Sequence, residues 1–566
     1  MNTELKEVYD VIVLGAGAGG MTAAIVAANE GLETLIVEKT DFVGGTTSFS
    51  GGMCWVPNNH KQSDVGSTDT LEQAEKYLNE IAGDGVGAKL RSYFLRRGPE
   101  AIEYLYKNSD VKLVPLAFYP DYYPDAVGAT TGGRVMEPLP FDARELGSDF
   151  KKLRPPLPEF TLFGGMMIAR PDLVHFRNVF KSVASTLRVA RLSLAYFIQR
   201  IRHHRGTKLY LGNALAARLL RSLQKLNVGV QLNRAVNQLI FENGRVVGVE
   251  IETKGGVRTI QARRGVILAT GGFAHNPDLR KKYLPPEASP YSATSPGNTG
   301  DGIQLGERVG GLVPDDGNDG YWAPVSKFTR PDGTKAIFPH TVTDRGKPGF
   351  MTVNQDGHRF TNEANSYHDF VQGMFQAHRN RPAIPAHLIC DKQSLWEYGL
   401  GAVKPRNIGL KHHIKTGYVY EAATLESLAK KINVDAAELL ATITRYNLDS
   451  EQGEDTLFGR GSNEYHRYTG DPSNQPNPCM RPLKTAPFYA IQIYPGDLGT
   501  AAGLGASKDA QVVDSNGNPI EGLYACGNDM AGIMSGAYPG PGITLGPALV
   551  FGYLAGMHLA RIQVKP

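Results

Sequence analysis

Hydrophobic positions near the start of the chain fall into two short runs on either side of a glycine-rich turn. Residues 9–14 (YDVIVL) are rich in β-branched side chains and predict a strand buried on both faces of a parallel sheet. After the turn, residues 21–31 (MTAAIVAANEG) have the composition of a helix. Residues 32–39 (LETLIVEK) predict a second strand. The order of strand, glycine turn, helix and strand is that of a βαβ unit.

Turn signals divide the later hydrophobic runs. Between residues 236 and 268, Asn243-Gly244 and Gly255-Gly256 separate β-branched runs, which predicts two consecutive hairpins of a small meander. Asn516-Gly517 predicts another turn of this kind. From about residue 317 to 485 the pattern changes to segments rich in proline, aspartate and aromatic residues, mixed with helices such as 425–447. We interpret residues 317–485 as an inserted α+β domain.

Length, charge and cysteine content limit the class of protein. A chain of 566 residues is long for one hydrophobic core, so we expect two domains. A net charge of +4 is mild for this length and does not indicate a nucleic-acid partner. Four scattered cysteines without metal-ligand spacing predict reduced core thiols, no metal site and a cytoplasmic protein. The sequence shows neither a secretory signal region nor an apolar run long enough to span a membrane.

The glycine-rich turn has the spacing of a dinucleotide site. Gly15 allows the tight turn, Gly17 lets backbone N–H groups approach a pyrophosphate, and Gly20 lets the helix pack against the strand. Glu38 ends the second strand, where an acidic residue holds the hydroxyls of the adenosine ribose. The same spacing serves NAD and FAD, so the turn alone does not identify the cofactor.

The segment after Glu38 distinguishes FAD from NAD. Lys39 is followed by Gly44-Gly45-Thr46-Thr47-Ser48 and then by Ser50-Gly51-Gly52. These residues resemble the glycine-hydroxyl run of the fumarate-reductase-like and ketosteroid-dehydrogenase flavoproteins, in which it wraps the pyrophosphate and the ring edge. The resemblance implies FAD as the cofactor. Histidine is absent from residues 46–52, where some relatives attach the flavin covalently, so we expect noncovalent binding.

Two distant segments resemble parts that close over FAD in that family. Residues 265–272 form an apolar strand ending in glycines, followed by 298–302, and residues 522–529 combine a strand with a glycine turn. The resemblance implies an α/β fold in which residues 1–316 and 486–566 form a Rossmann-like FAD-binding domain. Residues 317–485 would then be the substrate-capping domain. The resemblance assigns to FAD the residues Gly15, Gly17, Gly19, Gly20, Glu38, Lys39, Gly45, Thr46, Thr47, Ser48, Gly51, Gly52, Ala269, Thr270, Gly271, Asn298, Gly300, Asp301, Gly527, Asn528, Gly542 and Leu545.

The C-terminal run 535–547 (SGAYPGPGITLGP) resembles the 3-ketosteroid delta-1-dehydrogenases. In that family a tyrosine hydroxyl and the N–H of the glycine four positions later bind the steroid's carbon-3 carbonyl oxygen, and Tyr538 and Gly542 match these positions. Two donors converging on one oxygen stabilise enolate character and acidify the neighbouring C–H group. Fumarate-reductase relatives instead place an arginine here to clamp a carboxylate, where this chain has Ala537-Tyr538, so we expect a neutral ketone as substrate.

Two further segments resemble tyrosine-bearing stretches of the same family. Residues 118–124 (FYPDYYP) would supply Tyr122, which supports the catalytic base, and residues 359–370 would supply the base itself, Tyr367. A phenol has a reference pKa near 10, so Tyr367 needs a hydrogen-bonded neighbour or a nearby charge to act as a base. We interpret Tyr119 and Tyr123 as packing residues.

The resemblance implies a trans elimination from a 3-ketosteroid. Tyr538 and Gly542 would hold the ketone, Tyr367 would take a proton from carbon 2, and FAD would receive hydride from carbon 1. Dehydrogenation at carbons 4 and 5, flavin-dependent reduction of an enone, and a non-catalytic lipid-binding flavoprotein remain alternatives. A quinone is our candidate for the electron acceptor.

Residues 173–205 combine helical spacing with many basic residues and no acidic one. A basic amphipathic helix with aromatic residues is a candidate for lying on an anionic membrane, here the inner face of the cell membrane. The alternative is a helical hairpin packed on the body with a solvated basic face. The sequence leaves both open. The apolar residues that would cover one side are Phe176, Val179, Phe180, Val183, Leu187, Leu194, Phe197 and Ile201, and the basic ones are Arg177, Lys181, Arg188, Arg191, Arg200, Arg202 and Arg205.

Overall fold

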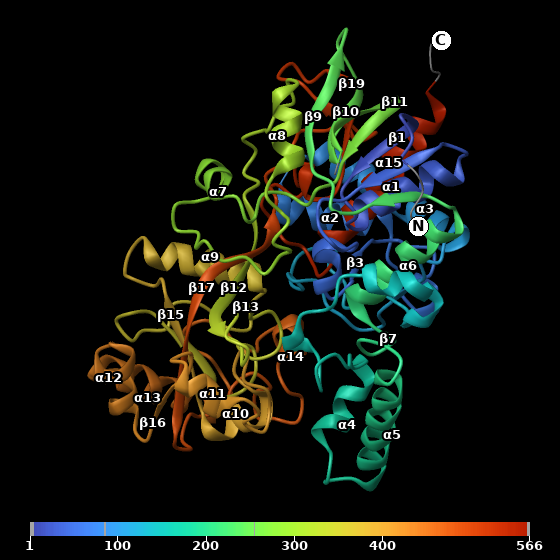
Figure 1. Cartoon of the computed structure of the whole chain (residues 1–566). Helices are drawn as coiled ribbons and strands as arrows, with labels where there is room; N and C mark the ends of the chain where they lie inside the picture. The colour runs from blue at the N-terminus through green and yellow to red at the C-terminus, as the bar shows by residue number, and fades with distance from the viewer. Residues whose placement is uncertain (1–4, 84–86, 254, 563–566) are drawn as a thin grey trace.

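The computed structural model describes residues 5–83, 87–253 and 255–562 (Figure 1). Its first sheet has eight strands in the order β18-β19-β10-β11-β1-β2-β8, with β9 paired to β10. β1 pairs in parallel with β2 and β11, as a βαβ unit requires. The strands are β1 (Val8–Leu14), β2 (Thr34–Val37), β8 (Gly229–Gln231), β9 (Val236–Glu242), β10 (Arg245–Thr253), β11 (Gly256–Leu268), β18 (Gln511–Val513) and β19 (Pro519–Ala525).

The structure confirms the strands and turns predicted for this sheet. β9, β10 and β11 form the meander, and β18 and β19 pair antiparallel around the turn at Asn516-Gly517. α1 (Ala18–Asn29) packs against α15 (Leu545–Arg561). A Cβ atom on Gly552 would lie 2.6 Å from the carbonyl oxygen of Gly19, so only glycine permits this approach of the two helices. Both ends of the chain therefore build the same layer.

A second sheet lies in the lower part of Figure 1 and has six strands in the order β13-β12-β17-β15-β14, with β16 paired to β17. Its long strand β17 was placed with the FAD-binding domain by the sequence-based division at residue 486. That division is wrong, because β17 pairs with β12, β15 and β16 of the second sheet. The strands are β12 (Gly320–Thr329), β13 (Lys335–Pro339), β14 (Phe350–Val353), β15 (Ala386–Asp391), β16 (Tyr420–Ala422) and β17 (Phe488–Thr500).

The predicted helix 425–447 is two helices. α12 (Leu425–Ile432) ends at Asn433, which has a φ of 57° and therefore leaves the helical conformation. α13 (Ala436–Gln452) begins after Asp435, whose side chain accepts a hydrogen bond from the N–H of Glu438. The other elements are α2 (Leu71–Ala82), α3 (Ala88–Asn108), α6 (Leu211–Lys225), α7 (Pro277–Tyr283), α8 (Asp301–Arg308), α9 (Tyr367–His378), α10 (Lys392–Tyr398), α11 (Leu410–Lys415), α14 (Glu464–Thr469), β3 (Cys54–Trp55), β4 (Leu113–Pro115), β5 (Val135–Pro138), β6 (Phe141–Asp142) and β7 (Lys208–Leu209).

Residues 173–205 form a helical hairpin that extends away from both sheets (Figure 1). A single helix over this segment is wrong, because the chain breaks between α4 (Leu173–Arg177) and α5 (Val183–Arg200). Phe180 has a φ of 66°, and the Ser182 side chain caps the second helix. The predicted apolar residues Phe180, Val183, Leu187, Leu194, Phe197 and Ile201 are exposed, so they do not pack on the body. Arg205 departs from the predicted basic face, since it is buried and hydrogen-bonded to Asn213.

Candidate active site

The glycine turn of the βαβ unit leaves open space at the N-terminal end of α1. Gly15 has a φ of 103°, and a Cβ atom there would lie 2.2 Å from the carbonyl oxygen of Ala269. A Cβ atom on Gly20 would lie 2.2 Å from the carbonyl oxygen of Gly15, and one on Gly19 would lie 3.1 Å from the Sγ of Cys526. Because these glycines have no Cβ atom, the turn and the first residues of α1 can pack closely against the ends of β11 and β19.

Gly17 and Gly527 differ from the other glycines of this turn region. A Cβ atom on either would meet no atom within 4 Å. Gly17 is the N-cap of α1 and lacks a side-chain capping bond. A helix N-terminus with open space beside it suits a pyrophosphate, so this part of the chain fits FAD.

Glu38 and Lys39 connect the glycine turn to other predicted cofactor segments. The Glu38 carboxylate accepts hydrogen bonds from the N–H of Ala16 (2.9 Å) and of Thr40 (2.8 Å). Lys39 forms an ion pair with Asp301 at 2.6 Å. A carboxylate has about four acceptor positions, so these bonds leave Glu38 capacity for ribose hydroxyls.

Residues 45–52 hold the glycine turn from the opposite side. The hydroxyl of Thr47 accepts from the N–H of Ala18 (3.1 Å), and that of Thr46 accepts from the side chain of Asn298 (3.0 Å). The Ser48 hydroxyl is buried and lacks a hydrogen-bond partner in the part of the chain that the structure describes. A buried hydroxyl of this kind is available to a ligand oxygen.

Several glycines of the remaining predicted cofactor segments lie so close to neighbouring atoms that a side chain would not fit. Gly51 and Gly52 precede β3, and a Cβ atom on Gly52 would lie 2.5 Å from the N atom of Gly212. One on Gly271 would lie 2.9 Å from the side-chain oxygen of Asn298, and one on Gly300 would lie 2.3 Å from Leu279. These close approaches draw distant segments of the chain together.

Asp529 binds several of these segments and was missed in the sequence. It is fully buried, next to the predicted Asn528, and accepts hydrogen bonds from the N–H of Gly272 (2.9 Å) and the hydroxyl of Thr270 (3.0 Å). Burial raises the pKa of Asp529, and the bonds from Thr270 and Gly272 oppose that shift. The signal was an acidic residue directly after the glycine turn that ends β19.

Three tyrosines that are far apart in the sequence meet where the second sheet faces the first. The hydroxyl oxygens of Tyr367 and Tyr538 are 2.9 Å apart. The ring of Tyr122 lies 5.6 Å from that of Tyr367 and 5.7 Å from that of Tyr538, measured between centroids. All three side chains are buried. The structure therefore brings together the three tyrosines that the sequence analysis named.

The loop that carries Tyr538 and Gly542 is held on both sides. The carbonyl oxygen of Pro539 accepts hydrogen bonds from the N–H of Tyr122 (3.0 Å) and the hydroxyl of Tyr77 (2.6 Å). The carbonyl oxygen of Gly542 accepts from the N–H of Trp55 (3.1 Å). Within the described residues the N–H of Gly542 donates no hydrogen bond, so it is available to a ligand. Leu545, the last predicted cofactor residue, is half-buried at the start of α15.

α9 fixes Tyr367 through its N-terminal cap. Tyr367 is the first residue of the helix, and the Ser366 side chain accepts a hydrogen bond from the N–H of Asp369 (3.1 Å). The hydroxyl of Tyr123 donates to Asp369 at 2.7 Å. Tyr123 thus ties the Tyr122 segment to the helix that carries Tyr367, which adds a hydrogen bond to its predicted packing role. Tyr119 packs against Tyr468, at 4.5 Å between ring centroids.

His368 supports the Tyr538 loop and was also missed in the sequence. Its Nδ1 accepts from the N–H of Trp322 (3.3 Å), so its Nε2 donates to the carbonyl oxygen of Gly536 (3.0 Å). Burial lowers the pKa of His368, which keeps the ring neutral. Its ring lies 5.5 Å from that of Tyr538.

Burial determines the protonation of the tyrosine cluster. It raises the pKa of Tyr367 above its ordinary value, and the hydrogen bond with Tyr538 only partly opposes that rise. Burial also raises the pKa of Tyr538, and the hydrogen bond with Tyr367 adds to that rise. A protonated Tyr538 can donate to a ketone oxygen. Tyr367, by contrast, needs further support to act as a base.

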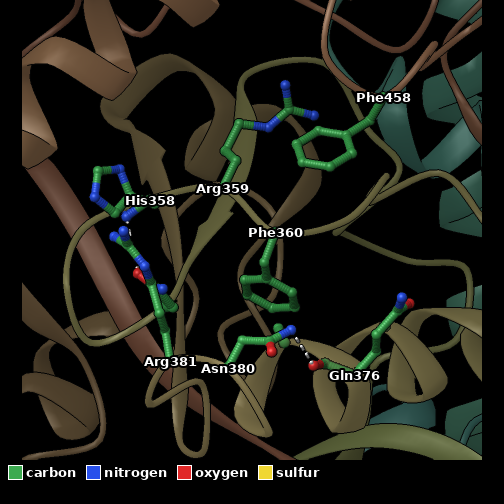
Figure 2. A pocket seen from close by; sticks show the side chains of 10 residues that line it. His358, Arg359, Phe360, Gln376, Asn380, Arg381 and Phe458 are labelled. Carbon is green, nitrogen blue, oxygen red and sulfur yellow. Dashed lines mark hydrogen bonds between the residues drawn. The ribbon is translucent and has the colours of Figure 1, made fainter.

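A cavity of about 650 Å³ lies outside this cluster (Figure 2). It opens beside the C-terminal half of α9, where Gln376, Asn380 and Arg381 line it together with Phe360. Arg359 also lines it, but its guanidinium is paired with Glu363 and Asp455. The cavity contains none of the clustered tyrosines and carries no part of the chemistry described above. Among the described residues, no group of three or more His, Cys, Asp or Glu side chains could hold a metal ion.

Comparison with known proteins identifies the family. The family model described as "FAD binding domain" matches residues 10–545. The chain is 39% identical over 557 residues to 4-oxocyclohex-2-ene-1-carboxylate 5-dehydrogenase of Sinomonas cyclohexanicum, covering 98% of this chain and 94% of that protein. It is 38% identical over 564 residues to 3-oxosteroid 1-dehydrogenase of Mycolicibacterium smegmatis, covering 98% of this chain and 97% of that protein.

A solved structure agrees with these relatives. The chain matches the crystal structure of 3-ketosteroid delta1-dehydrogenase from Sterolibacterium denitrificans in complex with 1,4-androstadiene-3,17-dione, with a TM-score of 0.91 and 37% identity. The match covers 98% of this chain and 100% of that one. The chain therefore belongs to the flavoprotein family of the 3-ketosteroid delta-1-dehydrogenases and is an FAD-dependent oxidoreductase.

Proposed function

We propose that this protein introduces a double bond between carbons 1 and 2 of a 3-ketosteroid. The observation that carries the proposal is the 2.9 Å contact between the hydroxyls of Tyr367 and Tyr538, together with the N–H of Gly542, four residues after Tyr538, which donates no hydrogen bond within the described residues. A hydrogen-bond donor to a carbonyl oxygen and a base for the adjacent C–H group must lie this close together. The relatives named for 3-oxosteroid dehydrogenation support the assignment.

Each residue of the cluster has one role in this reaction. Tyr538 and Gly542 donate hydrogen bonds to the ketone oxygen and stabilise the enolate that develops there. Tyr367 takes the proton from carbon 2, and Tyr122 supports Tyr367. FAD, when bound, supplies the acceptor for the hydride of carbon 1. One proton and one hydride leave the substrate, and the carbon–carbon double bond forms between the two carbons.

The residues that would hold FAD lie around the open end of α1. Gly17 would receive the pyrophosphate, Gly15, Gly19 and Gly20 would shape the turn beside it, and Glu38 would bind the ribose hydroxyls. Those that would surround the rest of the cofactor are Lys39, Gly45, Thr46, Thr47, Ser48, Gly51, Gly52, Ala269, Thr270, Gly271, Asn298, Gly300, Asp301, Gly527, Asn528, Gly542 and Leu545. We propose that the first sheet binds the cofactor, without a covalent bond, and that the second caps the substrate.

Anaerobic mixing of the FAD-loaded protein with a 3-ketosteroid tests the proposal. We expect the flavin absorbance to bleach and a 1,2-unsaturated ketone to form. A 4,5-unsaturated product, or reduction of an added enone, would instead support one of the alternative reactions. If no 3-ketosteroid bleaches the flavin, the dehydrogenation is refuted, and the result favours a non-catalytic lipid-binding flavoprotein.

A smaller cyclic ketone is a second candidate substrate. The Sinomonas relative is named for a cyclohexenone that carries a carboxylate, and its identity to this chain, 39%, is similar to that of the steroid enzymes. A carboxylate would need a cation near the ketone site, and the Tyr538 loop offers no arginine. Parallel assays of kcat/KM for 4-oxocyclohex-2-ene-1-carboxylate and a 3-ketosteroid would decide between them.

We propose a quinone as the electron acceptor. The reduced flavin must be reoxidised in each turnover, and a quinone soluble in lipid would be supplied at a membrane surface. Turnover with a ubiquinone or menaquinone analogue, compared with turnover under air, measures this preference. Equal rates with and without the quinone would exclude it.

We propose that the α4–α5 hairpin binds the anionic inner face of the cell membrane, with the rest of the protein in the cytoplasm. Phe180 and Val183 stand at the turn of the hairpin and are 86% and 78% exposed. The exposed Lys181 follows Phe180 in the turn, the exposed Arg191 lies further along α5, and the sequence from 173 to 205 contains no acidic residue. Exposed apolar tips beside basic side chains match the interface of an anionic bilayer. Within the described ranges, no helix is long and apolar enough to cross a membrane.

Vesicle sedimentation tests this surface. We expect binding to vesicles with phosphatidylglycerol, weaker binding at high salt, and little binding to pure phosphatidylcholine. Replacing both Phe180 and Val183 by serine should weaken binding about tenfold or more, since each buried side chain contributes roughly 1.5–3 kcal/mol. Phe241→Ser, at an exposed position of β9, is the matched control. Equal binding of the double variant and the control would refute the proposal.

A further inference from the structure

Arg345 is a buried cation with an unusual set of partners. It is 2% exposed, and its guanidinium donates only to backbone carbonyl oxygens: those of His340 (2.9 Å), Thr341 (3.0 Å), Glu363 (2.6 Å) and Asn365 (2.6 Å). Within the described residues it forms no ion pair with a carboxylate. A buried charge without a counter-ion is costly, so its presence calls for a negative group that appears in another state of the protein.

The neighbouring charged groups are already engaged with one another. Arg359 and Arg460 pair with Glu363, and Arg359 also pairs with Asp455. The carboxylate of Asp344 binds the imidazole of His340 at 2.7 Å. None of these groups supplies the guanidinium of Arg345 with a salt bridge. The charged or titratable groups that act on Arg345 or on the nearby Tyr465 are Tyr119, Tyr122, Tyr123, Asp344, Tyr367, Asp369, Arg460, His466 and Tyr468.

Tyr465 extends the tyrosine cluster toward Arg345. It is fully buried on α14, and its ring lies 4.7 Å from that of Tyr122, between centroids. Among the residues that the structure describes, the hydroxyls of Tyr465 and Tyr122 have no hydrogen-bond partner. Burial raises the pKa of Tyr465, and the charge of Arg345 opposes that rise more than any other neighbour does. Arg345 and the Tyr465 segment approach the same residue, because Arg345 donates to the carbonyl oxygen of Asn365 (2.6 Å) and His466, next to Tyr465, is hydrogen-bonded to the Asn365 side chain (2.8 Å). The order of groups is therefore Arg345, Tyr465, Tyr122 and Tyr367.

We propose that Arg345 is the buried counter-ion of the catalytic base, because it stabilises a negative charge that Tyr465, Tyr122 and Tyr367 share. Arg345 and Tyr465 act through Tyr122 and Tyr367 and are positioning residues. The inference rests on the proposed role of Tyr367 as the base. It explains how a phenol in an apolar site accepts a proton from carbon 2.

The proton transfers balance along this row of hydroxyls. In the reactive state Tyr465 carries the phenolate charge beside Arg345. Tyr367 accepts the carbon-2 proton and gives its own proton to Tyr122, which gives its own to Tyr465. The substrate proton thus neutralises the phenolate, and Tyr465 must lose that proton to water before the next turnover.

The pH dependence of flavin reduction tests the proposal in the FAD-loaded protein. In Arg345→Gln the rate with a 3-ketosteroid should fall by about 10- to 100-fold at neutral pH, and the profile should move up by about one to two pH units. Arg345→Lys keeps the charge and should restore most of the rate. Tyr465→Phe should also lower the rate of flavin reduction. Tyr446→Phe, at a buried tyrosine of α13, should have the same rate as the unaltered protein.

A second measurement separates this inference from the proposed function. Alkaline titration of the tyrosine ultraviolet absorbance reports phenolate formation without turnover, and one phenol should ionise at higher pH in Arg345→Gln. If this shift occurs but no ketosteroid reduces the flavin, the proposed function fails and the counter-ion stands. If the unaltered protein turns over and Arg345→Gln loses rate equally at every pH, or keeps its profile, the counter-ion is refuted. If Arg345→Gln does not fold, the pH profile of flavin reduction in Tyr465→Phe decides the question in its place.

Discussion

Replacing Gly542 by alanine tests the geometry of the ketone site without removing a polar group. Gly542 has a φ of 96°, and a Cβ atom there would lie 2.5 Å from the carbonyl oxygen of Met53 and 2.7 Å from the N atom of Cys54. Ordinary contacts between heavy atoms begin near 3.5 Å, so the loop must move by about 1 Å. The left-handed conformation adds roughly 1–2 kcal/mol for a residue with a Cβ atom.

The displacement should be seen in catalysis more than in cofactor binding. A shift of about 1 Å can cost roughly 10²-fold in rate, and loss of one donor to an oxyanion costs roughly 10²–10³-fold. We therefore expect kcat for the 3-ketosteroid to fall by about 10²–10³-fold. Most of the FAD content should be retained, because Gly542 is one of many proposed cofactor residues and the glycine turn at Gly15–Gly20 lies in a different segment of the site.

The control is Gly333→Ala in the turn between β12 and β13. Gly333 has a φ of 86°, and a Cβ atom there would meet nothing within 4 Å, so this variant has the same conformational cost without the collision. Stopped-flow reduction of the flavin and its bound fraction are measured for both variants. If Gly542→Ala keeps kcat within about threefold of Gly333→Ala, the N–H of Gly542 is not a donor to the substrate.

Four further outcomes follow from the structure. Tyr538→Phe should lower kcat by about 10²–10³-fold while FAD stays bound; retention of rate would remove Tyr538 from the oxyanion site. Asp529→Ala leaves the N–H of Gly272 unpaired, so FAD should dissociate more easily in a fluorescence assay, and unchanged affinity would contradict this. Acid or heat should release all of the flavin into the supernatant, whereas flavin that stays with the precipitate would indicate a covalent bond. Burial raises the pKa of Asp319 to about 6, so its native state binds more protons than the unfolded state between the ordinary value of 3.8 and 6. Stability from this group therefore falls as pH rises through that window, and Asp319→Asn should raise the apparent Tm at pH 8 but not at pH 4.

Local signals in the sequence were enough to predict the cofactor-binding region. Gly15, Gly17 and Gly20 are separated by fixed short spacings, and the strands beside them have continuous apolar runs, so a βαβ unit could be predicted. The family resemblance added Tyr122, Tyr367 and Tyr538, and the structure places these tyrosines in contact. Spacing alone could not have chosen three of 25 tyrosines.

Features that depend on long-range contacts could not be predicted. The pairing of β17 with the second sheet depends on partners more than 60 residues away in the sequence, so the division at residue 486 was wrong. Phe180 breaks the predicted helix with a positive φ that its residue type does not favour. Asp529 and Arg345 look like surface residues in the sequence, and only the fold shows that they are buried.

Two buried phenols in contact must have opposite tasks for the reaction to proceed. Tyr538 must keep its proton, because it donates to the ketone oxygen, and its raised pKa serves that role. Tyr367 must lose its proton, although the same burial raises its pKa too. Their shared hydrogen bond separates the two pKa values in part, because it opposes the rise for Tyr367 and adds to the rise for Tyr538. The rest of the difference must come from outside the contact. Tyr122 and Tyr465 lead from Tyr367 toward Arg345, a buried guanidinium that forms no ion pair with a carboxylate in the described part of the chain. The direction of proton transfer therefore follows from where the fold places one positive charge.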